Sequence, residues 1–108
     1  MAYEQTRFDI HRLRSDVLTG TRPLRITTHA QTEAFKDGLL LADLRYAFEQ
    51  GEVIETYPDD VRGLLYAQLP EPVVPVHIVV EETPEEGVII TAYIPDKRRW
   101  IRDRKRRK

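Results

Sequence analysis

The stretch PVHIVVEE at residues 75–82, followed after a short acidic turn by VIITAYI at residues 88–94, decides the fold. Apolar side chains alternate along both segments, which is typical of β-strands. With a turn centred near Pro84, the pattern predicts an antiparallel hairpin with one wholly apolar face. In that register His77 lies directly across from Thr91 and diagonal to Tyr93 on the other face. The apolar face pairs Val76, Ile78 and Val80 with Ala92, Ile90 and Val88.

Two further segments with alternating character, 52–57 and 64–69, precede this hairpin. Pro, Gly or acidic residues separate all four segments, and connections this short favour an antiparallel meander. The segment 24–27 is short enough for an edge strand.

Three helices are predicted before the strands. An amphipathic pattern over 5–19 predicts a helix that docks on the core or on a second subunit. Thr28 and Gln31 fit an N-terminal capping box for a second helix that runs to about Asp37 and ends at Gly38. A third helix has apolar residues at three- and four-residue spacing, and it stops at Gly51. Its buried face comprises Leu41, Leu44, Ala47 and Phe48.

Length and composition fit one globular domain. The chain has 108 residues, of which 41% are hydrophobic and 32% are charged. It lacks cysteine, which excludes disulfides, thiol catalysis and cysteine-based zinc sites. No apolar run approaches the ~20 residues that span a bilayer, and the N-terminus lacks signal-peptide features. We therefore predict a cytoplasmic protein that does not bind membranes and that forms a monomer or a homodimer.

Charge divides the chain into an acidic body and a basic tail. Residues 1–96 carry eight Lys/Arg and seventeen Asp/Glu, a net charge of −9, whereas residues 97–108 carry nine Lys/Arg and one Asp, a net charge of +8. A basic tail fits salt-sensitive binding to nucleic acid, with Trp100, Arg104 and Arg106 as candidates. The alternative is a solvated terminus that balances the acidic body.

Seven short stretches occur in a fixed order along the chain: 26–30 (ITTHA), 37–38 (DG), 51–55 (GEVIE), 57–60 (YPDD), 75–80 (PVHIVV), 89–93 (IITAY), and 95–96 (PD) followed by Trp100. Together they resemble a small prokaryotic family of unknown function, DUF4258, over roughly residues 24–100. Members of that family are distantly similar to RelE-type and BrnT-type ribonuclease toxins. The chain departs from the family pattern at Glu33 and at Val73 or Val74, where many members carry Arg.

Pattern and resemblance together predict an α+β fold. Two short helices pack on a four-stranded antiparallel sheet, RelE-like, with an added N-terminal helix. The predicted organisation is an N-terminal helical extension at 1–22, a single α+β domain at 23–100 and a basic tail at 101–108.

The resemblance to toxins implies one possible activity, a metal-independent endoribonuclease without a cofactor. RNA cleavage needs a base, an acid and a group that stabilises the phosphorane. His29 and His77 are the acid–base candidates, and Thr91 and Tyr93 are the residues that would orient them. Candidate phosphate or RNA contacts are Arg62, Tyr57 and Asp59. The partners implied are RNA and a cognate antitoxin.

Each candidate also has a structural interpretation. His29 and His77 fit hydrogen-bonded structural histidines, Tyr57 and Tyr93 fit packing residues, and Asp59 fits a turn after Pro58. A metal set of His29, His77 and Asp59 lacks the tight spacing of known motifs, so no metal is predicted. The second functional hypothesis is a non-catalytic interaction module that binds a protein partner through the N-terminal helix or an exposed strand edge.

Overall fold

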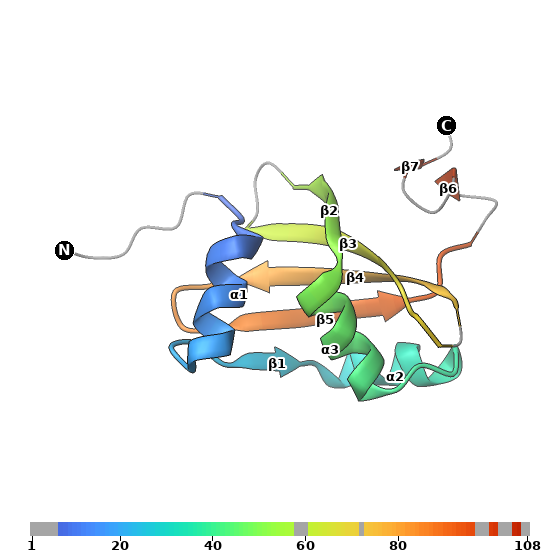
Figure 1. The fold of residues 1–108 in the computed structure, drawn as a ribbon, viewed down its shortest axis with the longest axis horizontal. Coiled ribbons are helices and arrows are strands. Elements are labelled where there is room, and N and C mark those ends of the chain that lie inside the picture. The colour runs from blue at the N-terminus through green and yellow to red at the C-terminus, as the bar shows by residue number, and fades with distance from the viewer. Residues whose placement is uncertain (1–6, 58–60, 72, 97–99, 102–104, 107–108) are drawn as a thin grey trace.

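The computed structural model describes residues 7–57, 61–71, 73–96, 100–101 and 105–106. Three helices and a five-stranded mixed sheet form one α+β unit (Figure 1). The helices are α1 (Ile10–Thr19), α2 (Thr28–Lys36) and α3 (Leu41–Gln50). The strands of the sheet are β1 (Leu24–Ile26), β2 (Glu52–Thr56), β3 (Arg62–Gln68), β4 (Pro75–Glu82) and β5 (Gly87–Tyr93).

The strand order is β1-β5-β4-β3-β2, so β1 and β2 form the two edges of the sheet. Strands β2 to β5 form the expected antiparallel meander. The prediction of four antiparallel strands was wrong in one respect, because β1 adds a fifth strand parallel to β5. The chain then turns into α2, which lies along β5 beyond the end of β1 (Figure 1).

The hairpin register differs from the prediction. His77 lies opposite Tyr93, and Thr91 lies opposite Val79. Two features shift the pairing of the strands. The turn runs from Thr83 to Glu86, where Thr83 donates its N–H to the carbonyl oxygen of Glu86. In addition, a β-bulge interrupts β5 opposite the Val79–Val80 step. The buried face of β4 is nevertheless the predicted one.

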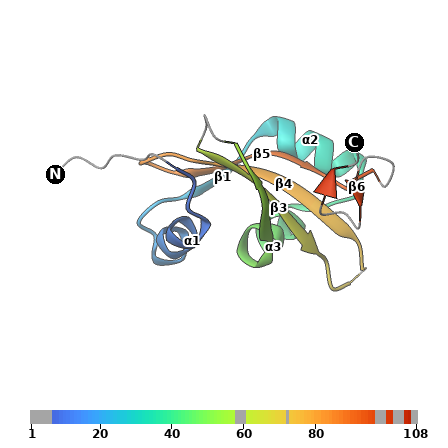
Figure 2. The same ribbon diagram turned by 90° about the horizontal axis from the view of Figure 1, so that it is seen from above.

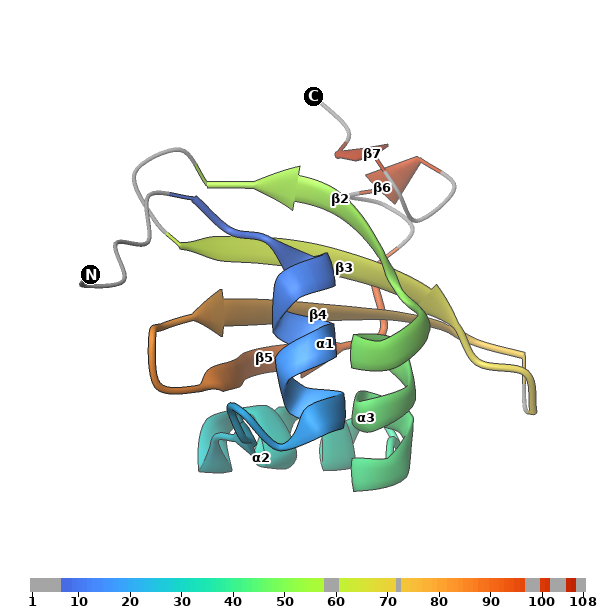
Figure 3. The ribbon, with the colours of Figure 1, turned by 60° about the vertical axis from the view of Figure 1, so that its left-hand side comes forward.

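Helices α1 and α3 cover one face of the sheet, as Figures 2 and 3 show, and we call this the helix-covered face. The N-terminal helix was expected to dock on the core or on a second subunit, and in the structure it docks on the core, since Ile10 and Leu13 belong to the core cluster. Two strand glycines permit the close approach of this segment. A Cβ atom on Gly63 would lie 2.5 Å from Phe8 Cε2, and one on Gly87 would lie 2.9 Å from Leu13 Cδ1.

Helix boundaries follow local capping. The side chain of Asp9 accepts a hydrogen bond from the N–H of Arg12, so α1 begins at Ile10 and not near residue 5. Thr27, not Thr28, caps α2, and the side-chain amide of Gln31 donates to the carbonyl oxygen of Ile26. The predicted stops at Gly38 and Gly51 are confirmed.

A buried ionic cluster fixes α1 to the end of β4. Glu82 is fully buried, and its carboxylate accepts hydrogen bonds from the N–H of Asp9 (2.8 Å), Arg12 Nε (3.1 Å) and Arg22 Nη2 (2.8 Å). Burial disfavours the charge of Arg22, but hydrogen bonds to Glu82 and Asp16 outweigh it and raise its pKa. Glu82 therefore has a structural role.

Two short strands, β6 (Trp100–Ile101) and β7 (Lys105–Arg106), pair antiparallel as a separate sheet. Among the residues that the structure describes, no helix has the length and apolar character needed to cross a membrane.

Candidate functional site

The sheet face opposite α1 and α3, which we call the second face, carries several of the side chains predicted to act on RNA. The strand register aligns Glu52, Tyr66, His77 and Tyr93 in one row across β2, β3, β4 and β5. The next row contains Glu55, Leu64, Val79 and Thr91. The alternation of the strands thus brings His77, Thr91 and Tyr93 onto one surface, as predicted.

His77 sits between two tyrosines. Its ring centroid lies 6.1 Å from that of Tyr66 and 5.4 Å from that of Tyr93, both in edge-on geometry. The distance from His77 Nδ1 to the Tyr93 hydroxyl oxygen is 3.3 Å. The side chain of His77 is fully buried. This geometry holds the imidazole ring in place but leaves none of its surface accessible to a substrate.

His29 lies elsewhere. It is exposed in the first turn of α2, whose preceding residue, Thr27, donates its N–H to the carbonyl oxygen of Ile89. The other end of α2 is held by Asp37, which accepts the N–H of Ile94 at 2.9 Å. Because His77 pairs with Tyr93, it lies at the level of the C-terminal end of α2, one helix length from His29, roughly 13 Å.

Three predicted residues do meet. Tyr57, Arg62 and Thr91 line a shallow hollow of about 300 Å³ on the second face, together with Val79 and Ile90. Arg62 Nε donates to Glu81 Oε1 at 2.9 Å. The hollow therefore offers a tyrosine hydroxyl, a threonine hydroxyl and a guanidinium that already contacts a carboxylate.

Four further residues were predicted to bind RNA: Asp59, Trp100, Arg104 and Arg106. Asp59 and Arg104 lie outside the described residues. The backbones of Trp100 and Arg106 pair with each other across β6 and β7. Within the described ranges, no three His, Asp or Glu side chains gather as metal ligands.

A larger cavity, of about 550 Å³, lies between the start of α1 and the edge strand β2. We call it the α1–β2 groove. Arg7, Phe8, Ile10, His11 and Arg14 form its helix side. Gly51, Glu52, Val53 and Thr56 form its strand side, and Asp9 lies at the helix start. The groove thus joins an apolar floor to basic side chains beside a strand at the edge of the sheet.

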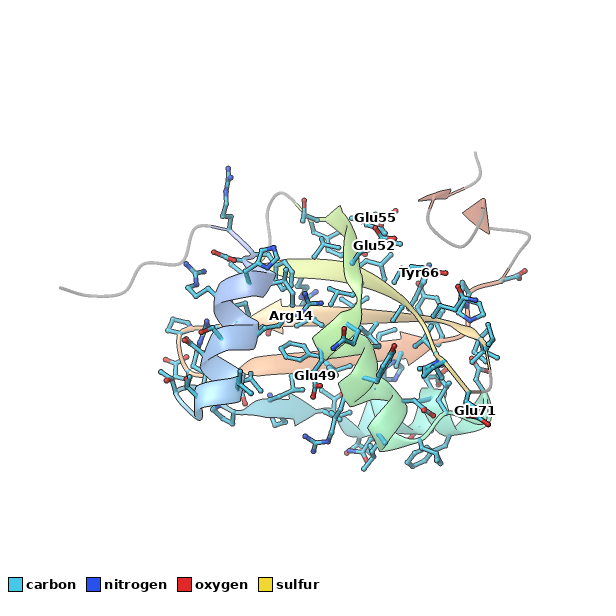
Figure 4. All side chains as sticks on the ribbon, viewed as in Figure 1. Arg14, Glu49, Glu52, Glu55, Tyr66 and Glu71 are labelled. Atoms are coloured by element: carbon cyan, nitrogen blue, oxygen red, sulfur yellow. The ribbon has the colours of Figure 1, made fainter. Side chains whose placement is uncertain are left out.

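Arg14 is the residue that the sequence analysis missed. Its Nε donates to the carbonyl oxygen of Phe48 at 2.7 Å, and its Nη2 donates to the carbonyl oxygen of Gly51. It spans the space between α1 and the junction of α3 with β2 (Figure 4). Desolvation lowers the pKa of Arg14 below its usual value.

The spacing of the apolar residues in α1 could have identified Arg14 from the sequence. Ile10, Leu13, Arg14 and Val17 have the i, i+3, i+4, i+7 spacing of a buried helix face. A charged residue at the third of these positions faces the packed side of α1, where an apolar residue is expected. An arginine on such a stripe indicates a buried polar contact or a binding site.

Comparison with protein families gives one match. The model of a family described as a domain of unknown function, DUF4258, matches residues 26–94, more than half of the chain. The chain belongs to the DUF4258 family. No curated protein and no solved structure matches it. The predicted family is therefore confirmed.

The DUF4258 match begins at the end of β1 and ends just after β5. It includes β2 and α3, which form one side of the α1–β2 groove. It leaves out α1 and the residues just before it, which supply the other side with Phe8, Ile10 and Arg14. In this DUF4258 protein, the groove is therefore built by an added helix against an edge of the family domain.

Proposed function

We propose that this DUF4258 domain is a protein-interaction module that binds an extended segment of a partner as an additional strand on β2. The observation that carries the proposal is the position of β2, which is an edge strand of the sheet and also forms one wall of the α1–β2 groove. A strand edge alone supports pairing with little selectivity, whereas an adjoining cavity selects side chains.

Strand addition explains how the two features act together. Main-chain hydrogen bonds to β2 would supply affinity, and alternate side chains of the partner would point to the helix-covered face. Val53, opposite Leu65 in the core cluster, marks that face of β2 and also lines the groove. Phe8 and Ile10 provide apolar contact for one or two partner side chains.

Peptide selection tests this proposal without a known partner. Short random peptides selected on the immobilised full chain are synthesised with N-methyl groups placed at one backbone nitrogen at a time. We expect affinity to fall with a period of two residues, because only every second N–H of an added strand faces β2. We also expect amide shifts in nuclear magnetic resonance spectra to concentrate at Gly51, Val53 and Thr56.

Two results would overturn strand addition. One is an N-methyl scan without the two-residue period. The other is a shift pattern centred on a different surface, such as the exposed apolar residues Phe35, Leu40 and Leu41 at the α2–α3 connection.

A second candidate is the toxin-like, metal-independent endoribonuclease of RelE-like type, in which a cognate antitoxin would be the partner. The hollow lined by Tyr57, Arg62 and Thr91, one row from His77 on the second face, supports it. The burial of His77 and its separation from His29 oppose it. For these reasons we rank it second.

Cleavage of a mixed RNA pool separates the two functions. Purified protein is incubated with and without EDTA, beside His29→Gln, His77→Gln and, as a control histidine on α1 away from the second face, His11→Gln. EDTA-resistant cleavage that both His29→Gln and His77→Gln abolish, and His11→Gln retains, would establish the nuclease. The interaction module predicts no cleavage by any of the folded proteins.

A further inference from the structure

We infer that the α1–β2 groove selects a partner segment with an acidic side chain, and that Arg14 binds this carboxylate. The inference rests on the proposed function, because it names the chemistry of the segment that adds to β2. It depends on three properties of Arg14: its partners, its burial and its position between two cavities.

The hydrogen bonds of Arg14 leave donors for a ligand. A guanidinium has five N–H groups. The structure directs one from Nε and one from Nη2 to two backbone carbonyls, those of Phe48 and Gly51. The side that Nη1 and Nη2 share retains one N–H on each nitrogen. That pair has the geometry for a two-point bond to a carboxylate.

The charge of Arg14 lacks a carboxylate partner in the described part of the chain. Its two acceptors are neutral, and they are carbonyls at the C-terminal end of α3, which carries only a partial negative charge. Burial disfavours the charged guanidinium, and this desolvation lowers the pKa of Arg14. An anionic ligand would therefore gain more from Arg14 than from an arginine already paired with a carboxylate.

Neighbouring charges favour an anion at the helix end of the groove. Arg7 and His11 are exposed there, and neither forms an ion pair with another described residue. Asp9 lies beside them, but its carboxylate accepts the N–H of Arg12 as the cap of α1. Glu52 also lines the groove, but the strand register places its side chain in the second-face row with Tyr66, on the side of the sheet opposite α1. The carboxylate of the ligand is therefore expected at Arg14.

Arg14 also lines a second cavity, of about 260 Å³, between α1 and α3. Val17, Leu18 and Phe48 make the lining of that cavity mainly apolar, and Glu49 also lines it. Leu18 is 88% exposed, so its apolar side chain is open to contact from a ligand. A segment that passes Arg14 would therefore place an apolar side chain here. The recognised chemistry is an acidic residue near a large apolar one.

The test uses the peptides that the selection yields. We expect them to be enriched in Asp or Glu at one position. Replacing that residue by Asn or Gln should weaken binding to the wild-type chain roughly 10- to 100-fold, the range for loss of a charge-assisted hydrogen bond. Arg14→Gln should weaken the acidic peptide similarly and should leave its amide counterpart unchanged. Arg14→Lys should recover part of the loss.

Arg45→Gln is the matched control, because Arg45 is an exposed arginine on α3 that lines none of the described cavities. It should bind the acidic peptide like wild type. In wild-type protein, the Arg14 Nε–Hε resonance should shift with the acidic peptide and not with its amide counterpart. This measurement requires no variant, so it remains informative if Arg14→Gln unfolds.

The possible outcomes distinguish the role of Arg14 from strand addition to β2. Peptides that show the two-residue N-methyl period but no acidic preference and no Arg14 resonance shift would overturn the role of Arg14 and leave strand addition intact. Peptides that need both Arg14 and an acidic residue but lack the two-residue period would overturn strand addition and retain the carboxylate site. Failure to select any peptide would overturn both.

Discussion

The ring of Phe8 lies directly over Gly63, so close that a Cβ atom on Gly63 would sit 2.5 Å from Cε2 of the ring. Gly63→Ala should therefore push Phe8 away from β3 and destabilise the chain by about 1–3 kcal/mol, the usual cost of overpacking. Urea unfolding followed by circular dichroism measures this change. In a Phe8→Leu background, the same alanine should cost less, because the smaller side chain can move aside. Equal costs in the two backgrounds would show that the contact is not responsible.

Glu82 provides a second prediction. Its buried carboxylate lies between Arg12 and Arg22, and Arg22 is only 4% exposed. Glu82→Gln should lower the free energy of unfolding by about 3 kcal/mol, the lower end of the cost of breaking a buried ion pair, because it leaves the buried guanidinium of Arg22 with Asp16 as its one carboxylate partner. Glu86→Gln, which alters a surface ion pair with Arg25, is the control and should change stability little. Similar effects for the two variants would contradict the structural role of Glu82.

The parts of the fold that the sequence predicts are those with a strong local pattern. Alternation identifies β2 to β5 to within two residues at each end, and the stops at Gly38 and Gly51 mark α2 and α3. Strand β1 differs, because three residues carry too little alternation to reveal a partner that follows more than 60 positions later. The bulge in β5 is likewise invisible, since a bulge changes pairing and not the apolar character of the segment.

The residues of the candidate sites also differ in whether a local pattern predicts their position. Strand alternation places His77, Thr91 and Tyr93 on one face, because residues two apart share a face once a strand is established. The position of His29 depends on the direction of α2 along β5, which no local pattern encodes. Arg14 and Glu82 are both charges on otherwise apolar faces of the sequence pattern. Arg14 lies on the helix face formed by positions 10, 13, 14 and 17, and Glu82 lies on the strand face formed by positions 76, 78, 80 and 82. A charged residue that interrupts an apolar periodicity therefore indicates a buried polar contact, as both of these residues make.

Tyr93 tests how firmly the His77 ring is held. Tyr93→Phe removes the hydroxyl that lies 3.3 Å from His77 Nδ1 and keeps the ring contact. We expect a loss of about 1 kcal/mol in the free energy of unfolding and a changed Nδ1 resonance of His77 in nitrogen-detected nuclear magnetic resonance. Tyr46→Phe, on the exposed side of α3, is the control and should alter neither quantity. An unchanged Nδ1 resonance in Tyr93→Phe would exclude this hydrogen bond.

The Arg25–Glu86 pair predicts a pH effect at the β1–β5 edge. The hydrogen bond from Arg25 lowers the pKa of Glu86 below its ordinary value, despite slight desolvation that acts in the opposite direction. The pair therefore contributes stability above the pKa that Glu86 has in the unfolded chain, and this contribution disappears as the pH falls through the lower pKa of the folded state. Arg25→Gln should raise the pKa of Glu86 in a carboxyl-carbon titration of the folded protein. A Glu86 titration that is identical in wild type and Arg25→Gln would show that the pair does not persist in solution.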